Sequence, residues 1–85
     1  MYVILVYDLT DNKNRVHKLC KKYLNWVQNS VFEGEITVAN LKILKIEIKK
    51  LISDNDSVLV FDSKHRLNLN KDIIGNEKNC ITNFI

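Results

Sequence analysis

The chain has 85 residues, enough for one small domain, and a net charge of +3 from 13 basic and 10 acidic side chains. Its 46% hydrophobic and 27% charged residues predict a globular protein and exclude a disordered one. The mild charge allows nucleic acid as a partner, although a protein that only coats nucleic acid is usually more basic. A lone domain of this size buries about 60–65% of the surface of its unfolded chain, so we expect a marginal core that needs further support.

The two cysteines, Cys20 and Cys80, are far apart and show no paired spacing. The apolar run over residues 2–7 is too short for a signal peptide or a membrane span. We therefore expect a cytoplasmic protein with reduced thiols, with a disulfide between the two cysteines as the less favoured alternative.

Residues 2–8 form a continuous apolar run that is rich in β-branched and aromatic side chains, which predicts a strand buried on both faces. Residues 10–12 offer helix-capping chemistry, and residues 13–24 are then predicted to form an amphipathic helix. The apolar stripe of this helix consists of Val16, Leu19, Cys20, Tyr23 and Leu24.

Residues 26–36 are strand-like, with a turn signal at Asn29 and Ser30. One bulged strand or a tight hairpin fits this pattern, and we prefer the hairpin. Thr37 is placed to cap a second helix that ends near residues 53–56. The apolar stripe of that helix consists of Leu41, Leu44, Ile48, Leu51 and Ile52.

Residues 58–61 form a last apolar strand, and the chain becomes polar after Asp62. Short apolar pieces at residues 73–74, 80–81 and 84–85 indicate small strands or docking segments. The order strand, helix, hairpin, helix, strand predicts an α+β, ferredoxin-like βαββαβ fold, a four-stranded antiparallel sheet with two helices on one face. We expect one domain over residues 1–85, with a core of about 1–63 and a C-terminal extension over 64–85.

Two helices cover only one face of such a sheet, yet the first and last strands are apolar on both. A second copy of the chain is the simplest cover, so we predict a homodimer packed through the helix-free face. The extension is expected to add to the dimer by pairing strands across it.

Asp8 closes the first strand and, by the period of two, shares a face with Ile4 and Val6. If that face meets a partner, a two-fold axis brings two Asp8 carboxylates together, where they share a proton or hold a hard cation such as Mg²⁺. Such a cation would assist hydrolysis of a phosphodiester. The plainer alternative is that Asp8 only caps the loop before the first helix.

Basic side chains crowd the first helix, and we name Lys13, Arg15, Lys18 and Lys22 as candidate nucleic-acid contacts. A solvated helix face explains them equally well. Arg15, near the helix start, is expected to reach back toward Asp8.

The other carboxylates are weaker candidates. Asp11 is predicted to cap the helix, Glu33 and Glu35 to share one face of a solvated edge, and Asp62 to support Asp8 from the end of its own strand. Tyr7 is expected to pack beside the site.

Several motifs are absent from the chain. It has no glycine-rich phosphate loop, no paired-cysteine metal motif and no aromatic RNA-recognition signature, which argues against a copper chaperone or a standard RNA-recognition domain. His17 and His65 show no metal-ligand spacing. Ser30 lacks a His–Asp partner pattern, so a turn role is favoured.

The residues together resemble the CRISPR-associated Cas-two family. The resemblance rests on Tyr-Val-Ile-Leu-Val-Tyr-Asp-Leu over residues 2–9, an Arg-Val pair entering a helix, and Gln-Asn-Ser-Val-Phe-Glu-Gly over 28–34. Residues 56–58 and Ile74-Gly75 also match, so the resemblance spans nearly the whole chain. Trp26 departs from the pattern, because many members carry a basic residue there.

The resemblance implies a homodimer with a Mg²⁺ site at Asp8 of both protomers, and tentative roles for Arg15 and Phe32. It implies a Cas-one integrase dimer as partner in acquiring new spacers. It also implies metal-dependent cleavage of single-stranded RNA or double-stranded DNA, or a non-catalytic scaffold role beside the integrase. A toxin-like ribonuclease outside a CRISPR locus and a small-molecule-sensing dimer are the remaining alternatives, and we favour the adaptation role.

Overall fold

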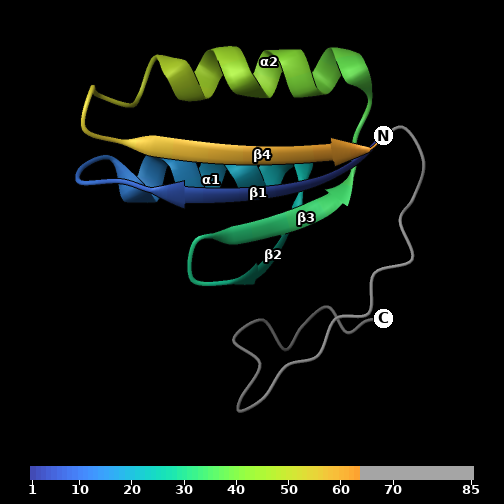
Figure 1. Cartoon of the computed structure of the whole chain (residues 1–85), viewed down its shortest axis with the longest axis horizontal. Helices are drawn as coiled ribbons and strands as arrows, with labels where there is room; N and C mark the ends of the chain where they lie inside the picture. The colour runs from blue at the N-terminus through green and yellow to red at the C-terminus, as the bar shows by residue number, and fades with distance from the viewer. Residues whose placement is uncertain (64–85) are drawn as a thin grey trace.

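The computed structural model describes residues 1–63, which form a four-stranded antiparallel sheet covered on one face by two helices. The strands lie in the order β2-β3-β1-β4, with α2 running along β4 and α1 behind β1 (Figure 1). The predicted ferredoxin-like α+β fold is therefore confirmed, and the predictions for residues 64–85 lie outside the described residues. The elements are β1 (Tyr2–Asp8), α1 (Lys13–Tyr23), β2 (Asn25–Gln28), β3 (Val31–Glu35), α2 (Val38–Lys49) and β4 (Ser57–Ser63).

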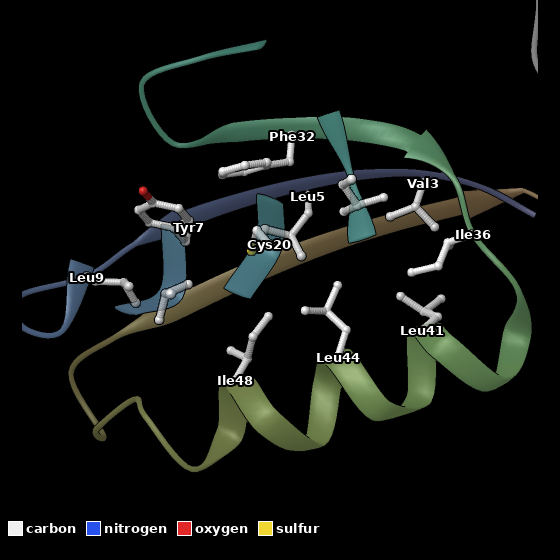
Figure 2. Close-up of a cluster of buried hydrophobic side chains, with 12 residues drawn as sticks. Val3, Leu5, Tyr7, Leu9, Cys20, Phe32, Ile36, Leu41, Leu44 and Ile48 are labelled. Carbon is white, nitrogen blue, oxygen red and sulfur yellow. The ribbon is translucent and has the colours of Figure 1, made fainter. Parts of the chain in front are cut away.

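The core lies between the sheet and the helices. Val3 and Leu5 of β1 are fully buried, and Tyr7 is nearly so, because alternate side chains of this strand point to the helical layer. Leu41, Leu44 and Ile48 of α2 point up toward these strand residues (Figure 2). Phe32 of β3 and Val16 and Cys20 of α1 complete the centre of the core.

The other face of the sheet, which we call the open face, is also apolar. Ile4 and Val6 lie there and pair across to Phe61 and Leu59 of β4. Phe61 is 60% exposed and Leu59 55% exposed. The prediction that β1 and β4 carry apolar side chains on both faces of the sheet is thus confirmed. Within residues 1–63, the helices cover only one of those faces.

The segment over residues 25–35 is a hairpin, as preferred, and it also carries a bulge between Trp26 and Gln28. Asn29 takes the left-handed conformation (φ 46°) that a tight turn requires. The Trp26 indole N–H donates to the Asn29 carbonyl at 3.0 Å, which ties the bulged strand to its own turn.

Thr37 caps α2 as predicted, because its hydroxyl accepts the Asn40 N–H at 3.1 Å. The helix ends at Lys49, earlier than predicted. The Lys50 and Leu51 N–H groups donate to the carbonyls of Glu47 and Ile48, three residues back, so the last turn tightens before the chain leaves the helix. Neither helix within residues 1–63 is long and apolar enough to cross a membrane.

Cys20 is a buried free thiol in α1. Burial raises its pKa to about 12. It is therefore a core residue and carries no nucleophilic role.

Candidate functional site

Asp8 is the last residue of β1 and pairs with Ser57 at the start of β4. It is exposed and follows Ile4 and Val6 on the open face, as the alternation predicted. No side chain within residues 1–63 forms a hydrogen bond or ion pair with its carboxylate. An exposed carboxylate that no described side chain pairs with is available to bind a ligand.

A hollow of about 310 Å³ opens beside Asp8. It lies where the end of β1, the β2–β3 turn and the start of α1 meet. The Tyr7 N–H donates to the Ser30 carbonyl at 3.2 Å, which holds the turn against β1. The hollow is lined by Tyr7, Asp8, Leu9, Lys13, Asn29 and Ser30, so it combines one carboxylate, one ammonium group and two neutral polar side chains.

The side of the site that faces the core is an aromatic cluster. The His17 ring lies edge-on to both Trp26 and Phe32, with ring centroids 5.1 Å apart in each pair. Tyr7 stacks with Phe32 at 6.2 Å, and its hydroxyl lies 3.3 Å from His17 Nδ1.

The protonation of this cluster follows from its surroundings. Burial, followed by the charge of Lys21, lowers the pKa of His17. Burial, followed by Cys20, raises the pKa of Tyr7. The Tyr7 hydroxyl and His17 Nδ1 lie within hydrogen-bond distance of each other, so the cluster holds the Tyr7 ring beside the site.

The predicted basic residues are spread along α1 rather than gathered at Asp8. Lys13 shares the hollow with Asp8, whereas Arg15 lines a neighbouring hollow formed by residues 10–15. Lys18 is exposed on the helix. Lys22 lies at the opposite end of the sheet, in a hollow that it shares with Met1. Among residues 1–63, therefore, Lys13 is the basic residue that lines the hollow with Asp8, and the expected reach of Arg15 toward Asp8 is not observed.

Two expectations about the other carboxylates are wrong. Asp62 pairs with Val3, at the end of the sheet opposite Asp8, because β1 and β4 run antiparallel. Glu33 and Glu35 share the open face as predicted, but β3 is an inner strand and not an edge. Glu33 accepts the Tyr2 hydroxyl at 2.9 Å, and Glu35 lies 3.5 Å from the terminal ammonium group.

The loop after Asp8 is held by Asp56, for which the sequence predicted no role at the site. Asp56 Oδ1 accepts the Thr10 N–H at 2.8 Å and the Thr10 hydroxyl at 2.9 Å. Its Oδ2 accepts the Ser53 N–H at 2.8 Å and the Ser53 hydroxyl at 3.1 Å. The backbone N–H bonds, that of Thr10 first, lower the pKa of Asp56 to about 2. The local Ser-x-x-Asp spacing of residues 53–56 was the available signal, but the sequence could not show the bond to Thr10.

The residues around Asp8 fit a magnesium ion. Mg²⁺ in proteins is commonly bound by one or two carboxylates together with water and substrate phosphates. Asp8 supplies one carboxylate with which no side chain of residues 1–63 pairs. Residues 1–63 contain no cluster of three or more His, Cys, Asp or Glu side chains that could hold a metal. A second carboxylate from another copy of the chain would complete the pair.

Comparison with known proteins gives the family of the chain. The family model described as CRISPR associated protein Cas2 matches residues 1–68. The chain is 44% identical, over 99% of its own length and 98% of the relative's, to a Thermodesulfovibrio yellowstonii protein named CRISPR-associated endoribonuclease Cas2 3. It is also 44% identical, over the full length of both chains, to a Pyrococcus furiosus protein named CRISPR-associated endoribonuclease Cas2.

Solved structures extend the match to three dimensions. A structure titled as a crystal structure of cas2 is 43% identical and superposes with a TM-score of 0.82, covering 100% of this chain and 98% of the other. Streptococcus pyogenes Cas2 is 31% identical with a TM-score of 0.66, covering 74% of this chain and 86% of the other. The resemblance seen in the sequence is therefore confirmed, and the chain belongs to the family described as CRISPR associated protein Cas2.

Proposed function

We propose that this protein is a metal-dependent endonuclease of CRISPR adaptation that hydrolyses phosphodiester bonds of nucleic acid at Asp8. The observation that carries the proposal is the unpaired Asp8 carboxylate in one hollow with Lys13. A carboxylate suits a divalent cation, and a lysine suits the phosphate that the cation would polarise. The endoribonuclease names of the relatives support single-stranded RNA as the first substrate to test, with double-stranded DNA as the second.

The proposed active form is a homodimer packed through the open face. Phe61, Leu59, Ile4 and Val6 leave a contiguous apolar row on that face, which is the usual sign of a surface meant to be covered. A two-fold axis pairs each patch with itself and brings the two copies of Asp8 toward one another. The pair would supply the second carboxylate that a single protomer lacks.

In this mechanism each residue has a defined task. Asp8 of both protomers would hold the cation, which stabilises the charge that develops on the phosphodiester when it is bound. Lys13 would bind a phosphate oxygen of the strand. Tyr7, fixed by His17 and Phe32, forms the wall of the hollow and limits how the nucleotide lies. A water oxygen then forms a bond to phosphorus and gives up a proton to solvent, while the bond between phosphorus and the leaving oxygen breaks and that oxygen takes up a proton.

A specific observation also favours a second function, that of a non-catalytic scaffold that binds DNA beside the Cas-one integrase. Residues 1–63 contain nine Lys and Arg residues. Eight of them lie on α1 or α2, and the ninth, Lys50, is the C-cap residue of α2. Of these nine, Lys13 lines the hollow beside Asp8 and the other eight do not, so those eight suit binding more than cleavage. In this alternative Asp8 is dispensable for DNA binding.

The deciding experiment compares wild type, Asp8→Asn and Asp54→Asn on labelled single-stranded RNA and double-stranded DNA, with Mg²⁺ or with chelator. Asp54 is a matched control, because it is exposed and makes no bond within residues 1–63. We expect wild type and Asp54→Asn to cut only with Mg²⁺, and Asp8→Asn to lose at least about a hundredfold in rate, since even outer-shell changes at a metal cost up to that. Equal cutting by all three proteins would refute the catalytic role of Asp8, and binding without cutting by all three would favour the scaffold.

A further inference from the structure

The loop between β1 and α1 is shaped by contacts with a distant loop rather than by its own capping. Asn12 is the N-cap residue of α1, and it takes a left-handed conformation (φ 58°). Its side chain makes no capping bond, contrary to the capping role expected of residues 10–12. Instead its amide donates to the Leu51 carbonyl, just after α2, at 2.8 Å. A residue type that normally caps its own helix here joins two loops.

Asp56 makes the second connection between the same loops. Its Oδ1 takes both donors of Thr10 from the β1–α1 loop, and its Oδ2 takes both donors of Ser53 from its own loop. Both oxygens are therefore saturated at 2.8–3.1 Å. The low pKa of Asp56 means that the carboxylate remains charged throughout the range in which nucleic acid is handled.

These connections lie between Asp8 and Lys13 along the chain. Thr10 is two residues after Asp8, and Asn12 directly precedes Lys13. Lys13 begins α1 and lines the hollow with Asp8. A loop that shifted would carry the Lys13 ammonium group away from the hollow, while Asp8 would stay in place through its pairing with Ser57.

We infer that Asp56 is a positioning residue, which acts through Thr10 to hold Lys13 over the Asp8 hollow so that it can bind a nucleic-acid phosphate. The inference rests on the proposed function only in placing nucleic acid in that hollow. It does not require a metal or cleavage. The clamp formed by Asp56 and Thr10 thereby changes the affinity for the nucleic-acid strand and does not change the chemistry at Asp8.

The test uses two variants that each delete one hydroxyl from the same carboxylate. Thr10→Ala removes one of the two bonds that cross to the β1–α1 loop, and Ser53→Ala removes one of the two bonds within the α2–β4 loop, while the backbone N–H bond stays in each variant. Neither variant changes the net charge. Binding of labelled single-stranded RNA by the full chain is measured in chelator, so that no cleavage occurs, across a series of salt concentrations. Lys13→Gln and the double variant with Thr10→Ala complete the set.

We expect Lys13→Gln to lower the slope of log K against log salt by about 0.7, the share of one phosphate contact on a single strand. Thr10→Ala should raise Kd up to about fivefold, the size of a single hydrogen bond, and the double variant should bind no more weakly than Lys13→Gln alone. Ser53→Ala should leave Kd unchanged. All variants are compared well below their Tm.

Equal effects of Thr10→Ala and Ser53→Ala, or additive effects of Thr10→Ala and Lys13→Gln, would show that the clamp serves stability alone. An unchanged salt slope in Lys13→Gln would remove Lys13 from the binding site and overturn the inference. Neither result depends on the Asp8 cleavage assay, so the inference and the proposed nuclease can fail separately.

Discussion

The two faces of the sheet carry the same kind of side chain in opposite surroundings. Phe32 on the helix-covered face is fully buried, whereas Phe61 on the open face is 60% exposed. Neighbouring residues of β1 supply both faces, with Leu5 buried under the helices and Ile4 beside Phe61. A strand that is apolar on both sides therefore indicates that both faces of the sheet are to be buried. The arrangement of the helices alone decides which of the two faces the chain buries by itself.

The largest expected effect compares the same substitution on the two faces. Phe32→Ala should lower the free energy of unfolding by about 3–5 kcal/mol, because it leaves a cavity in the core. Phe61→Ala should cost at most about 0.5 kcal/mol in the dissociated protein. Urea denaturation at low protein concentration measures both. Similar losses in the two variants would mean that the open face is covered by the chain itself.

A charge on the open face should break the proposed dimer. Phe61→Lys is expected to weaken dimerisation by at least about tenfold in Kd, since central aromatic residues of interfaces commonly contribute more than 2 kcal/mol. Sedimentation velocity over a range of concentrations measures the change. The matched control is Lys45→Gln on α2, which should leave the dimer intact. A monomer at all concentrations in wild type would remove the dimer proposal.

The cover of the buried face depends on α2, whose first turn is capped by Thr37. Thr37→Ala should cost about 1 kcal/mol, the usual contribution of an N-cap, without altering the oligomeric state. Thermal unfolding followed by circular dichroism reports the loss, and Thr37→Ser should restore most of it. A change in dimerisation with Thr37→Ala would show that the two faces are coupled.

The smallest expected effect is a loss of stability at acidic pH, and it involves neither face of the sheet. Asp56 has a folded pKa of about 2 against an ordinary value of 3.8, so the stability that it contributes is present above about pH 4 and is lost as pH falls toward 2. Wild type should lose stability over that window. Asp56→Asn should start less stable and lack this part of the pH dependence. Parallel curves for the two proteins would show that the clamp to Thr10 is absent in solution.

Local pattern was sufficient to predict most of the fold. The apolar run of β1, the stripe of Leu41, Leu44 and Ile48, and the Thr37 cap each depend on residues close in sequence. Their periods and capping chemistry do not change with distant contacts. The predicted end of α2 is too late because Leu51 and Ile52 continue the apolar spacing beyond Lys49. At that point the backbone N–H groups of Lys50 and Leu51 already donate to carbonyls three residues back.

The candidate site was predictable only in part. Asp8 could be selected because it closes an apolar strand, and its face followed from the period of two. The partner of the β1–α1 loop was not predictable, because Thr10 and Asp56 are 46 residues apart. The position of Asp62 was likewise assigned by analogy with Asp8, and the antiparallel register placed it at the opposite end of the sheet.

The sequence by itself therefore determined the elements, the two apolar faces and the choice of Asp8, since all of these are encoded in short-range periodicity and residue type. Only the tertiary structure decided that Lys13 and not Arg15 shares the hollow with Asp8, and that Asp56 holds the loop between them. Both depend on hydrogen bonds and packing between segments that are distant in the chain, and no local pattern records which distant segments meet.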